Sequence, residues 1–166
     1  TICGQMISNQ AAAAIWRRLS ALPGVLDPAG LLALDDAALR GAGLSRPKVA
    51  HVRALAAAVL DGRLDVVALR AAPDDATVAA IAAIPGLGPW TAQVPLVFGF
   101  ERPDVFPAGD VALAAGVAHL KALPERPSPR ALAEMALAWS PWRSLAARLL
   151  WHHWRHATGR PAGEAP

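Results

Sequence analysis

Residues 79–93 read AAIAAIPGLGPWTAQ, and this stretch decides the prediction of the fold. An apolar helix is expected to end at Ile84, and Pro89 begins the next one, because proline is tolerated in the first turn of a helix. Gly86 and Gly88 lie between the two helices and allow positive φ angles and a close approach to another surface. The amides after Gly86 then face outward at a helix N-terminus, which favours an anion such as phosphate. An ordinary helix–helix turn explains the same residues, so this segment alone leaves both interpretations open.

The rest of the chain shows helical spacing and no alternating strand pattern, which predicts an all-α fold. Ser128-Pro129 and Ser140-Pro141 each combine a capping serine with a proline in the first helical position. Shorter helical turns are expected to end near residues 40 and 70, and residues 101–109 are expected to be irregular. A short helix is predicted over residues 28–34. The longer predicted helices cover residues 2–22, 47–60, 74–84, 89–100, 110–119 and 141–156.

Length and composition indicate one globular domain of 166 residues, with 54% hydrophobic and 17% charged residues. The formal charge is +3, the isoelectric point is near 10.0, and lysine occurs only at Lys48 and Lys121 among 16 basic residues. This balance suits a polyanionic partner. A GC-rich coding bias also enriches arginine, alanine and proline, so the composition does not choose between these explanations.

The single cysteine, Cys3, excludes a disulfide framework, a cysteine-ligated zinc site and a four-cysteine iron–sulfur cluster. We find no signal peptide and no apolar run of membrane-spanning length, so we expect a cytoplasmic protein without membrane contact. The sequence begins at Thr1 inside a predicted helix, so we expect that N-terminal residues are missing. Residues 159–166 are expected to form a flexible tail.

Asp110 lies directly behind Phe106-Pro107-Ala108-Gly109, a tight entry into the next predicted helix. A helix N-cap is the common role for such an aspartate. A catalytic role requires a carboxylate facing a cleft with aromatic walls, and tryptophans at positions 90, 139, 142, 151 and 154 can supply those walls. Most of these tryptophans are expected to fill the core.

Four segments, in order, resemble the helix-hairpin-helix DNA glycosylase superfamily and, within it, the bacterial 3-methyladenine DNA glycosylase II group. Trp142-Arg143-Ser144 and Trp151 resemble its closing helix. The resemblance covers nearly the whole chain. The four segments are ICGQMIS at 2–8, GLSRPK at 43–48, IPGLGPWTA at 84–92 and DVFPAGDVAL at 104–113.

The resemblance implies a glycosylase domain over 1–158, with two helical subdomains and an active-site cleft between them. The hairpin would be 79–93 and the catalytic loop 101–113. The partner would be duplex DNA with damaged bases, and the damaged nucleotide would be flipped out of the helix. We expect a monomer associated with the bacterial nucleoid. No cofactor is implied beyond a possible monovalent cation at the hairpin, and no iron–sulfur cluster.

The resemblance also assigns roles to residues. Asp110 would stabilise the positively charged sugar and help to activate water. Met6 would fill the gap left by the flipped base, although a core position explains Met6 equally well. The base pocket would contain Trp90, Trp151, Val94 and Val111. The DNA contacts would be Pro85, Gly86, Leu87, Gly88, Thr91, Arg46 and Lys48. The cation would be held by the backbone carbonyls of Ala82, Ile84 and Leu87.

Trp90 stands where relatives that also cut the DNA strand carry a lysine nucleophile. This predicts a monofunctional enzyme that removes alkylated purines such as 3-methyladenine and leaves an abasic site. Trp90 and Trp151 would stack on the electron-poor base. Val94 and Val111 stand where some members carry tyrosine, so the range of lesions stays open.

Two other hypotheses remain at this point. A non-catalytic helix-hairpin-helix module would bind DNA through the same hairpin without needing Asp110. A metal enzyme could use His152, His153 and His156, since the pairs 152/156 and 153/156 have helix-face spacing. Cationic residues near a helix C-terminus are also ordinary complements of the helix dipole.

Overall fold

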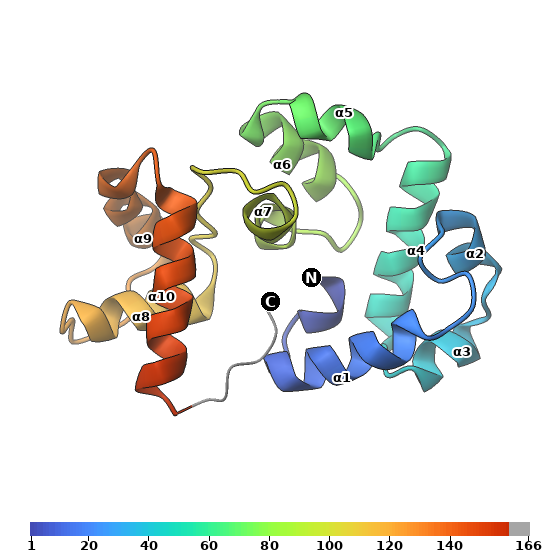
Figure 1. Cartoon of the computed structure of the whole chain (residues 1–166), viewed down its shortest axis with the longest axis horizontal. Coiled ribbons are helices and arrows are strands. Elements are labelled where there is room, and N and C mark those ends of the chain that lie inside the picture. Colours follow the sequence, from blue (N-terminus) through green and yellow to red (C-terminus); the bar gives the residue numbers. More distant parts are fainter. Residues whose placement is uncertain (160–166) are drawn as a thin grey trace. The chain divides into compact units, whose positions relative to one another are not determined.

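The computed structural model describes residues 1–159, and every regular element within them is helical (Figure 1). This confirms the all-α prediction. No helix in the described part of the chain is long and apolar enough to cross a membrane. The predicted tail lies outside the described residues except for Gly159.

The chain divides into two compact units, Thr1–Ala92 and a second that begins at Gln93. The boundary falls within α7 (Pro89–Phe98). The helices before α7 are η1 (Ile2–Gly4), α1 (Asn9–Ser20), α2 (Pro28–Ala33), α3 (Asp36–Gly41), α4 (Arg46–Leu60), α5 (Val66–Ala71) and α6 (Asp74–Ala82). The helices after it are α8 (Val111–Leu120), α9 (Pro129–Ala136), η2 (Leu137–Trp139) and α10 (Arg143–Ala157).

Local capping signals begin most helices of the first unit. Asp27 caps α2 by accepting a hydrogen bond from the Gly30 amide at 2.9 Å, and Asp35 caps α3 through the Ala38 amide at 2.7 Å. Each contact satisfies an amide that the helix itself cannot pair. Helix α2 packs against α4, and Leu39 of α3 is completely buried.

The second unit is organised by the packing of α8 against α10 (Figure 1). Gly116 makes this close approach possible, because a β-carbon there would lie 3.1 Å from the carbonyl oxygen of Leu150. Leu113 and Leu132 have no exposed surface. Full burial of a leucine side chain contributes about 1.5–3 kcal/mol relative to exposure.

The predicted helix over 2–22 is wrong in its first turns. Residues 5–8 form a turn, Met6 has a φ of 60°, and Ser8 caps α1 by accepting a hydrogen bond from the Ala11 amide at 3.3 Å. The Ser8 cap fixes the start of α1 at Asn9.

The last helix begins at Arg143 rather than at the predicted Pro141. The hydroxyl of Ser140 does not cap α10 but donates to Oδ2 of Asp104 at 2.8 Å. Oδ1 of Asp104 accepts from the Arg143 amide at 3.2 Å, so a residue distant in sequence satisfies the first amide of the helix. The same serine–proline signal at Ser128 is confirmed, because Ser128 accepts from the Ala131 amide.

Candidate functional site

The hairpin connects α6 to α7 through residues 83–88. Ile84 and Leu87 are buried, and the Leu87 amide donates to the Ile84 carbonyl at 3.0 Å, which closes the turn. Pro85, Gly86 and Gly88 are exposed. The buried apolar pair therefore holds the exposed backbone in place. The Leu87 amide is used inside the turn, so it is not one of the outward amides that the sequence predicted for phosphate.

Gly86 is required at the turn for two reasons. Its φ is 83°, in the region that side chains other than glycine rarely adopt. A β-carbon at Gly86 would also lie 1.9 Å from Cδ2 of His51, so the imidazole of α4 occupies the space where a side chain would stand. His51 packs directly against the hairpin, a role that its isolated position in the sequence did not indicate.

Gln5 connects the first turn of the chain to the hairpin. Its Nε2 donates to the Gly86 carbonyl at 3.1 Å and to Oγ1 of Thr91 at 2.9 Å. Its Oε1 lies 3.2 Å from Nδ1 of His51. The buried Thr91 therefore holds Gln5, and its hydroxyl is turned to the protein. Sequence reasoning did not assign Gln5 a role, although it stands within the ICGQMIS segment.

Met6 follows Gln5 and is fully exposed, with 101% of its reference surface accessible. This excludes the alternative that Met6 fills the core. An exposed apolar side chain on a turn with positive φ is available to another molecule. The role of Met6 in filling the gap in DNA stays a prediction.

The two basic residues at the start of α4 differ in their surroundings. Arg46 is exposed and lines a groove with Arg40, Gly43 and Ser45. Lys48 is only 7% exposed, and its Nζ donates to the Cys3 carbonyl at 2.7 Å. Burial lowers the pKa of Lys48 below its ordinary value. Its ammonium group holds the first turn of the chain, so this conformation does not support the predicted contact of Lys48 with phosphate.

Asp110 caps α8, as its position in the sequence suggested. Its Oδ1 accepts a hydrogen bond from the Leu113 amide at 2.9 Å. The same oxygen accepts a second hydrogen bond, from Nε1 of Trp151 in α10, at 3.1 Å. A helix cap alone does not need this second donor. The carboxyl group is half-buried and is fixed from two helices.

The predicted base-pocket residues have different exposures. Trp151 is 8% exposed, and the ring of Phe98 stacks on it with centroids 5.4 Å apart. Trp90 is half-buried, and Val111 is 66% exposed beside Asp110. Val94 is only 1% exposed. Val94 belongs to the core in this conformation, which does not support its predicted place in the base pocket.

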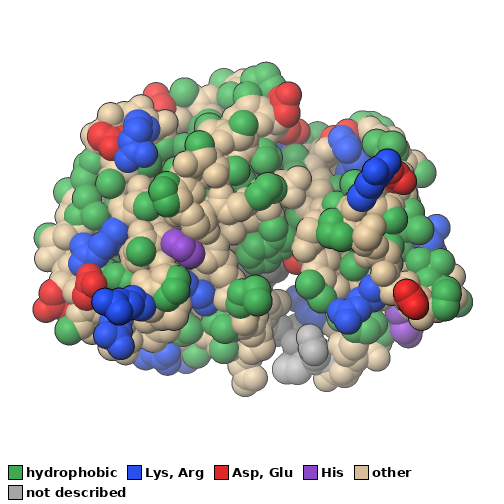
Figure 2. Space-filling model, turned by 180° about the vertical axis from the view of Figure 1, so that it is seen from behind, with side chains coloured by type: hydrophobic (Ala, Val, Ile, Leu, Met, Phe, Trp, Pro, Cys, Tyr) green, Lys and Arg blue, Asp and Glu red, His purple; other side chains and the backbone are tan. Residues whose placement is uncertain are grey.

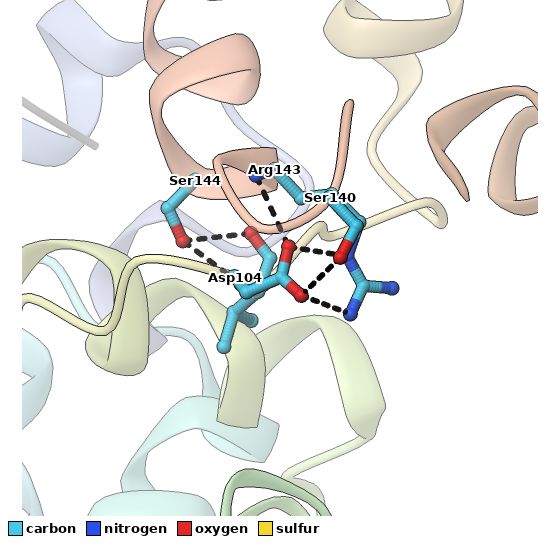
Figure 3. A network of polar contacts seen from close by, with 5 residues as sticks. Asp104, Ser140, Arg143 and Ser144 are labelled. Carbon is cyan, nitrogen blue, oxygen red and sulfur yellow. Dashed lines mark hydrogen bonds and ion pairs between the residues drawn. The ribbon is translucent and has the colours of Figure 1, made fainter. Parts of the chain in front are cut away.

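The loop that carries Asp110 is tied to the start of α10 by a polar network (Figure 3). Asp104 accepts hydrogen bonds from Nε of Arg143 at 2.7 Å and from its Nη2 at 2.9 Å. Ser144 accepts from the amide of Val105 and donates to the carbonyl of the same residue, each at 2.9 Å. The paired guanidinium of Arg143 lowers the pKa of Asp104 to about 2. This loop therefore has a defined conformation although it lacks regular structure.

The C-terminal histidines do not form the proposed metal site. His153 pairs with His119 of α8, with Nδ1 of His119 and Nε2 of His153 3.0 Å apart. The rings of His152 and His156 lie against each other, with centroids 4.7 Å apart. The described part of the chain has no group of three metal-binding side chains, so it does not support the hypothesis of a histidine metal site.

Residues 1–143 match the sequence profile of the HhH-GPD superfamily of base excision DNA repair proteins. The chain belongs to this superfamily. The comparison confirms the family resemblance found in the sequence. DNA-3-methyladenine glycosylase 2 of Escherichia coli is 29% identical over 164 residues, covering 91% of this chain and 54% of the relative.

Two solved structures are similar to this chain, and the first of them supports the same assignment. A DNA-3-methyladenine glycosidase from Bacillus halodurans superposes with a TM-score of 0.79 at 33% identity, covering 95% of this chain and 74% of the other. A 3-methyladenine DNA glycosylase from Schizosaccharomyces pombe in complex with abasic DNA superposes with a TM-score of 0.86, covering 95% of this chain and 77% of the other. At 24% identity, this second likeness shows the fold alone. The chain spans 43% of the length of a Bacillus subtilis relative.

The Asp104–Arg143 pair predicts a pH-dependent contribution to stability. Because the pKa of Asp104 is lowered in the folded protein, the contribution is present above the ordinary aspartate value and lost as the pH falls towards about 2. Asp104→Asn should lower the free energy of unfolding near neutral pH by about 1 kcal/mol or less, since the pair is partly exposed. Urea unfolding should show this difference shrinking below about pH 4.

Glu134→Gln is the matched control, because the Arg130–Glu134 pair is mostly exposed and should contribute little. The free energies of unfolding of wild type and Asp104→Asn should not differ by a constant amount down to about pH 2. A constant difference would show that the charge of Asp104 does not stabilise the loop.

Proposed function

We propose that this chain is a monofunctional DNA glycosylase that hydrolyses the N-glycosidic bond of alkylated purines in duplex DNA. The fixed carboxylate of Asp110 supports this proposal most directly. Its Oδ1 accepts hydrogen bonds from the Leu113 amide and from Nε1 of Trp151. A non-catalytic DNA-binding module would need the hairpin but would not need this arrangement. Membership of a superfamily of base excision repair proteins supports the enzymatic alternative.

The reaction needs a negative charge near the sugar. When the bond between C1′ and the base nitrogen breaks, the sugar becomes a cation, and a carboxylate about 4 Å away stabilises it by about 4 kcal/mol at an effective dielectric of about 20. Water then adds to C1′ and loses a proton, which Asp110 can accept. An alkylated purine already carries positive charge and leaves as a neutral base, so a strong general acid is not required.

The lysines support hydrolysis without strand cleavage. Cleavage through a covalent intermediate would require an amine that attacks C1′. By the family resemblance, Trp90 would stand where lysine-dependent relatives carry the nucleophile. Lys48 is buried with its Nζ bonded to Cys3, and Lys121 follows the C-terminal end of α8, whereas Asp110 caps its N-terminus. We therefore propose that the product is an intact strand with an abasic site.

Specific groups, rather than general positive charge, would bind the DNA. Figure 2 shows Lys and Arg side chains scattered over one face of the molecule, with Asp and Glu among them. The exposed glycines of the hairpin, Arg46 and Met6 are the candidates in the first unit. A bacterial enzyme of this kind would work as a monomer on the nucleoid DNA of the cytoplasm.

A monovalent cation at the hairpin is a further part of the proposal. Carbonyl oxygens suit such an ion, and the predicted donors are Ala82, Ile84 and Leu87. The Ile84 carbonyl already accepts from the Leu87 amide, but a carbonyl oxygen has two lone pairs and can also hold a cation. The cation would stabilise the turn and add positive charge near a bound phosphate.

Wild-type protein should release alkylated bases from duplexes that contain single lesions. Incubation with 3-methyladenine, 7-methylguanine, 1-methyladenine and etheno-adenine duplexes, followed by mass spectrometry, identifies the released base. We expect release of at least one free base and strand cleavage only after alkali treatment. Binding without release of any base would favour the non-catalytic module, and cleavage without alkali would contradict the monofunctional mechanism.

Arg46 and Lys48 should differ in the salt dependence of DNA binding. Each phosphate contact contributes about 0.9 to the slope of log affinity against log salt concentration. Arg46→Ala should reduce this slope by about that amount, whereas Lys48→Met should leave it unchanged, because Lys48 is buried. Fluorescence anisotropy over a salt series measures both slopes. An equal reduction of the slope in both variants would show that Lys48 also contacts phosphate.

A further inference from the structure

Gln5 connects the hairpin to Met6, and the proposed function uses these two parts of the first unit separately. Its side chain holds the hairpin at Gly86 and Thr91, and its backbone continues directly into Met6. Resting on the proposed function, we propose that Gln5, oriented by His51, is a positioning residue that fixes Met6 relative to the hairpin. Gln5 and His51 would set the distance between the Met6 side chain, which enters the DNA, and the hairpin backbone, which holds the phosphates.

The hydrogen bonds determine the orientation of both side chains. The carbonyl oxygen of Gly86 can only accept, so the group that faces it must be Nε2 of Gln5. Oε1 of Gln5 then faces Nδ1 of His51 and can only accept, so His51 carries its proton on Nδ1. The hydrogen bonds therefore run from Nδ1 of His51 to Gln5 and from Gln5 to the carbonyl oxygen of Gly86, where the chain of donors ends.

Helix α4 supplies the second support for the Met6 turn. Lys48 and His51 are three residues apart and therefore lie on one face of the helix. Lys48 donates to the Cys3 carbonyl, and His51 contacts Gln5, so one helix face holds the chain at two alternate residues just before Met6. These contacts maintain a turn in which Met6 has a φ of 60°, an uncommon conformation for a residue with a side chain.

The network would be only structural if it stabilised the fold without affecting how Met6 meets DNA. A double-mutant cycle separates these roles, because a positioning role makes the effect of Met6 depend on Gln5. The readout is the affinity of the whole chain for a duplex that contains a tetrahydrofuran abasic-site analogue. Thermal unfolding of each variant is measured in parallel.

Met6→Ala should weaken binding to this duplex about tenfold in the wild-type background and less than about twofold when Gln5→Ala is also present. Gln10→Ala is the matched control, because Gln10 is exposed on α1, and the tenfold effect should persist in that background. Equal effects of Met6→Ala in all backgrounds would overturn the proposal. No effect of Met6→Ala in the wild type would overturn it as well.

Substitutions of His51 test independently whether His51 orients the Gln5 side chain. They also test the proposal if Gln5→Ala does not fold. The amide nitrogen of asparagine can stand in the place of Nδ1, so His51→Asn should bind within about twofold of wild type. His51→Ala lacks the donor and should bind about as weakly as Met6→Ala. Equal affinity of His51→Asn and His51→Ala for this duplex would contradict the role of His51 as a hydrogen-bond donor to Gln5. Base release by the wild-type protein tests the enzymatic proposal separately. If the wild type releases bases but the effects of Met6→Ala and Gln5→Ala on binding are additive, only the positioning role of Gln5 is overturned.

Discussion

Two N–H groups, from Leu113 and Trp151, meet at one carboxylate oxygen of Asp110, and much of the second unit serves to keep them there. The Leu113 amide is available because α8 begins at Val111, and the indole is available because α10 packs closely on α8. Gly116 allows that approach. Phe98 stacks on Trp151 and limits the positions that the indole can take. In the proposed reaction, a carboxylate held in this way would not have to reorient.

The loop before Asp110 is fixed by the same kind of long-range contact. Asp104 binds Arg143, and Ser144 pairs with both backbone groups of Val105, so the start of α10 determines the path of the loop. In the first unit, Gln5 and His51 fix the hairpin in a comparable way. Irregular backbone is thus held in a defined conformation by side chains that are far away in sequence.

Local signals in the sequence predicted much of the fold. Ser128 and Asp110, expected as helix caps from the sequence, each accept from an amide three residues later, a relationship that short sequence windows contain. Proline and glycine likewise located the hairpin. Partners distant in sequence decided the features that were missed. Ser140 turns to Asp104 instead of capping α10, and Lys48 turns inward to the Cys3 carbonyl. Neither contact is visible in a local pattern.

We propose that the charge of Asp110, and not its capping hydrogen bond, drives base release. Single-turnover release of an alkylated base by Asp110→Asn tests this claim, because asparagine caps a helix about as well as aspartate. Asp27→Asn, at the cap of α2, is the matched control. We expect a rate at least about a hundredfold lower for Asp110→Asn and an unchanged rate for Asp27→Asn. A wild-type rate in Asp110→Asn would contradict it.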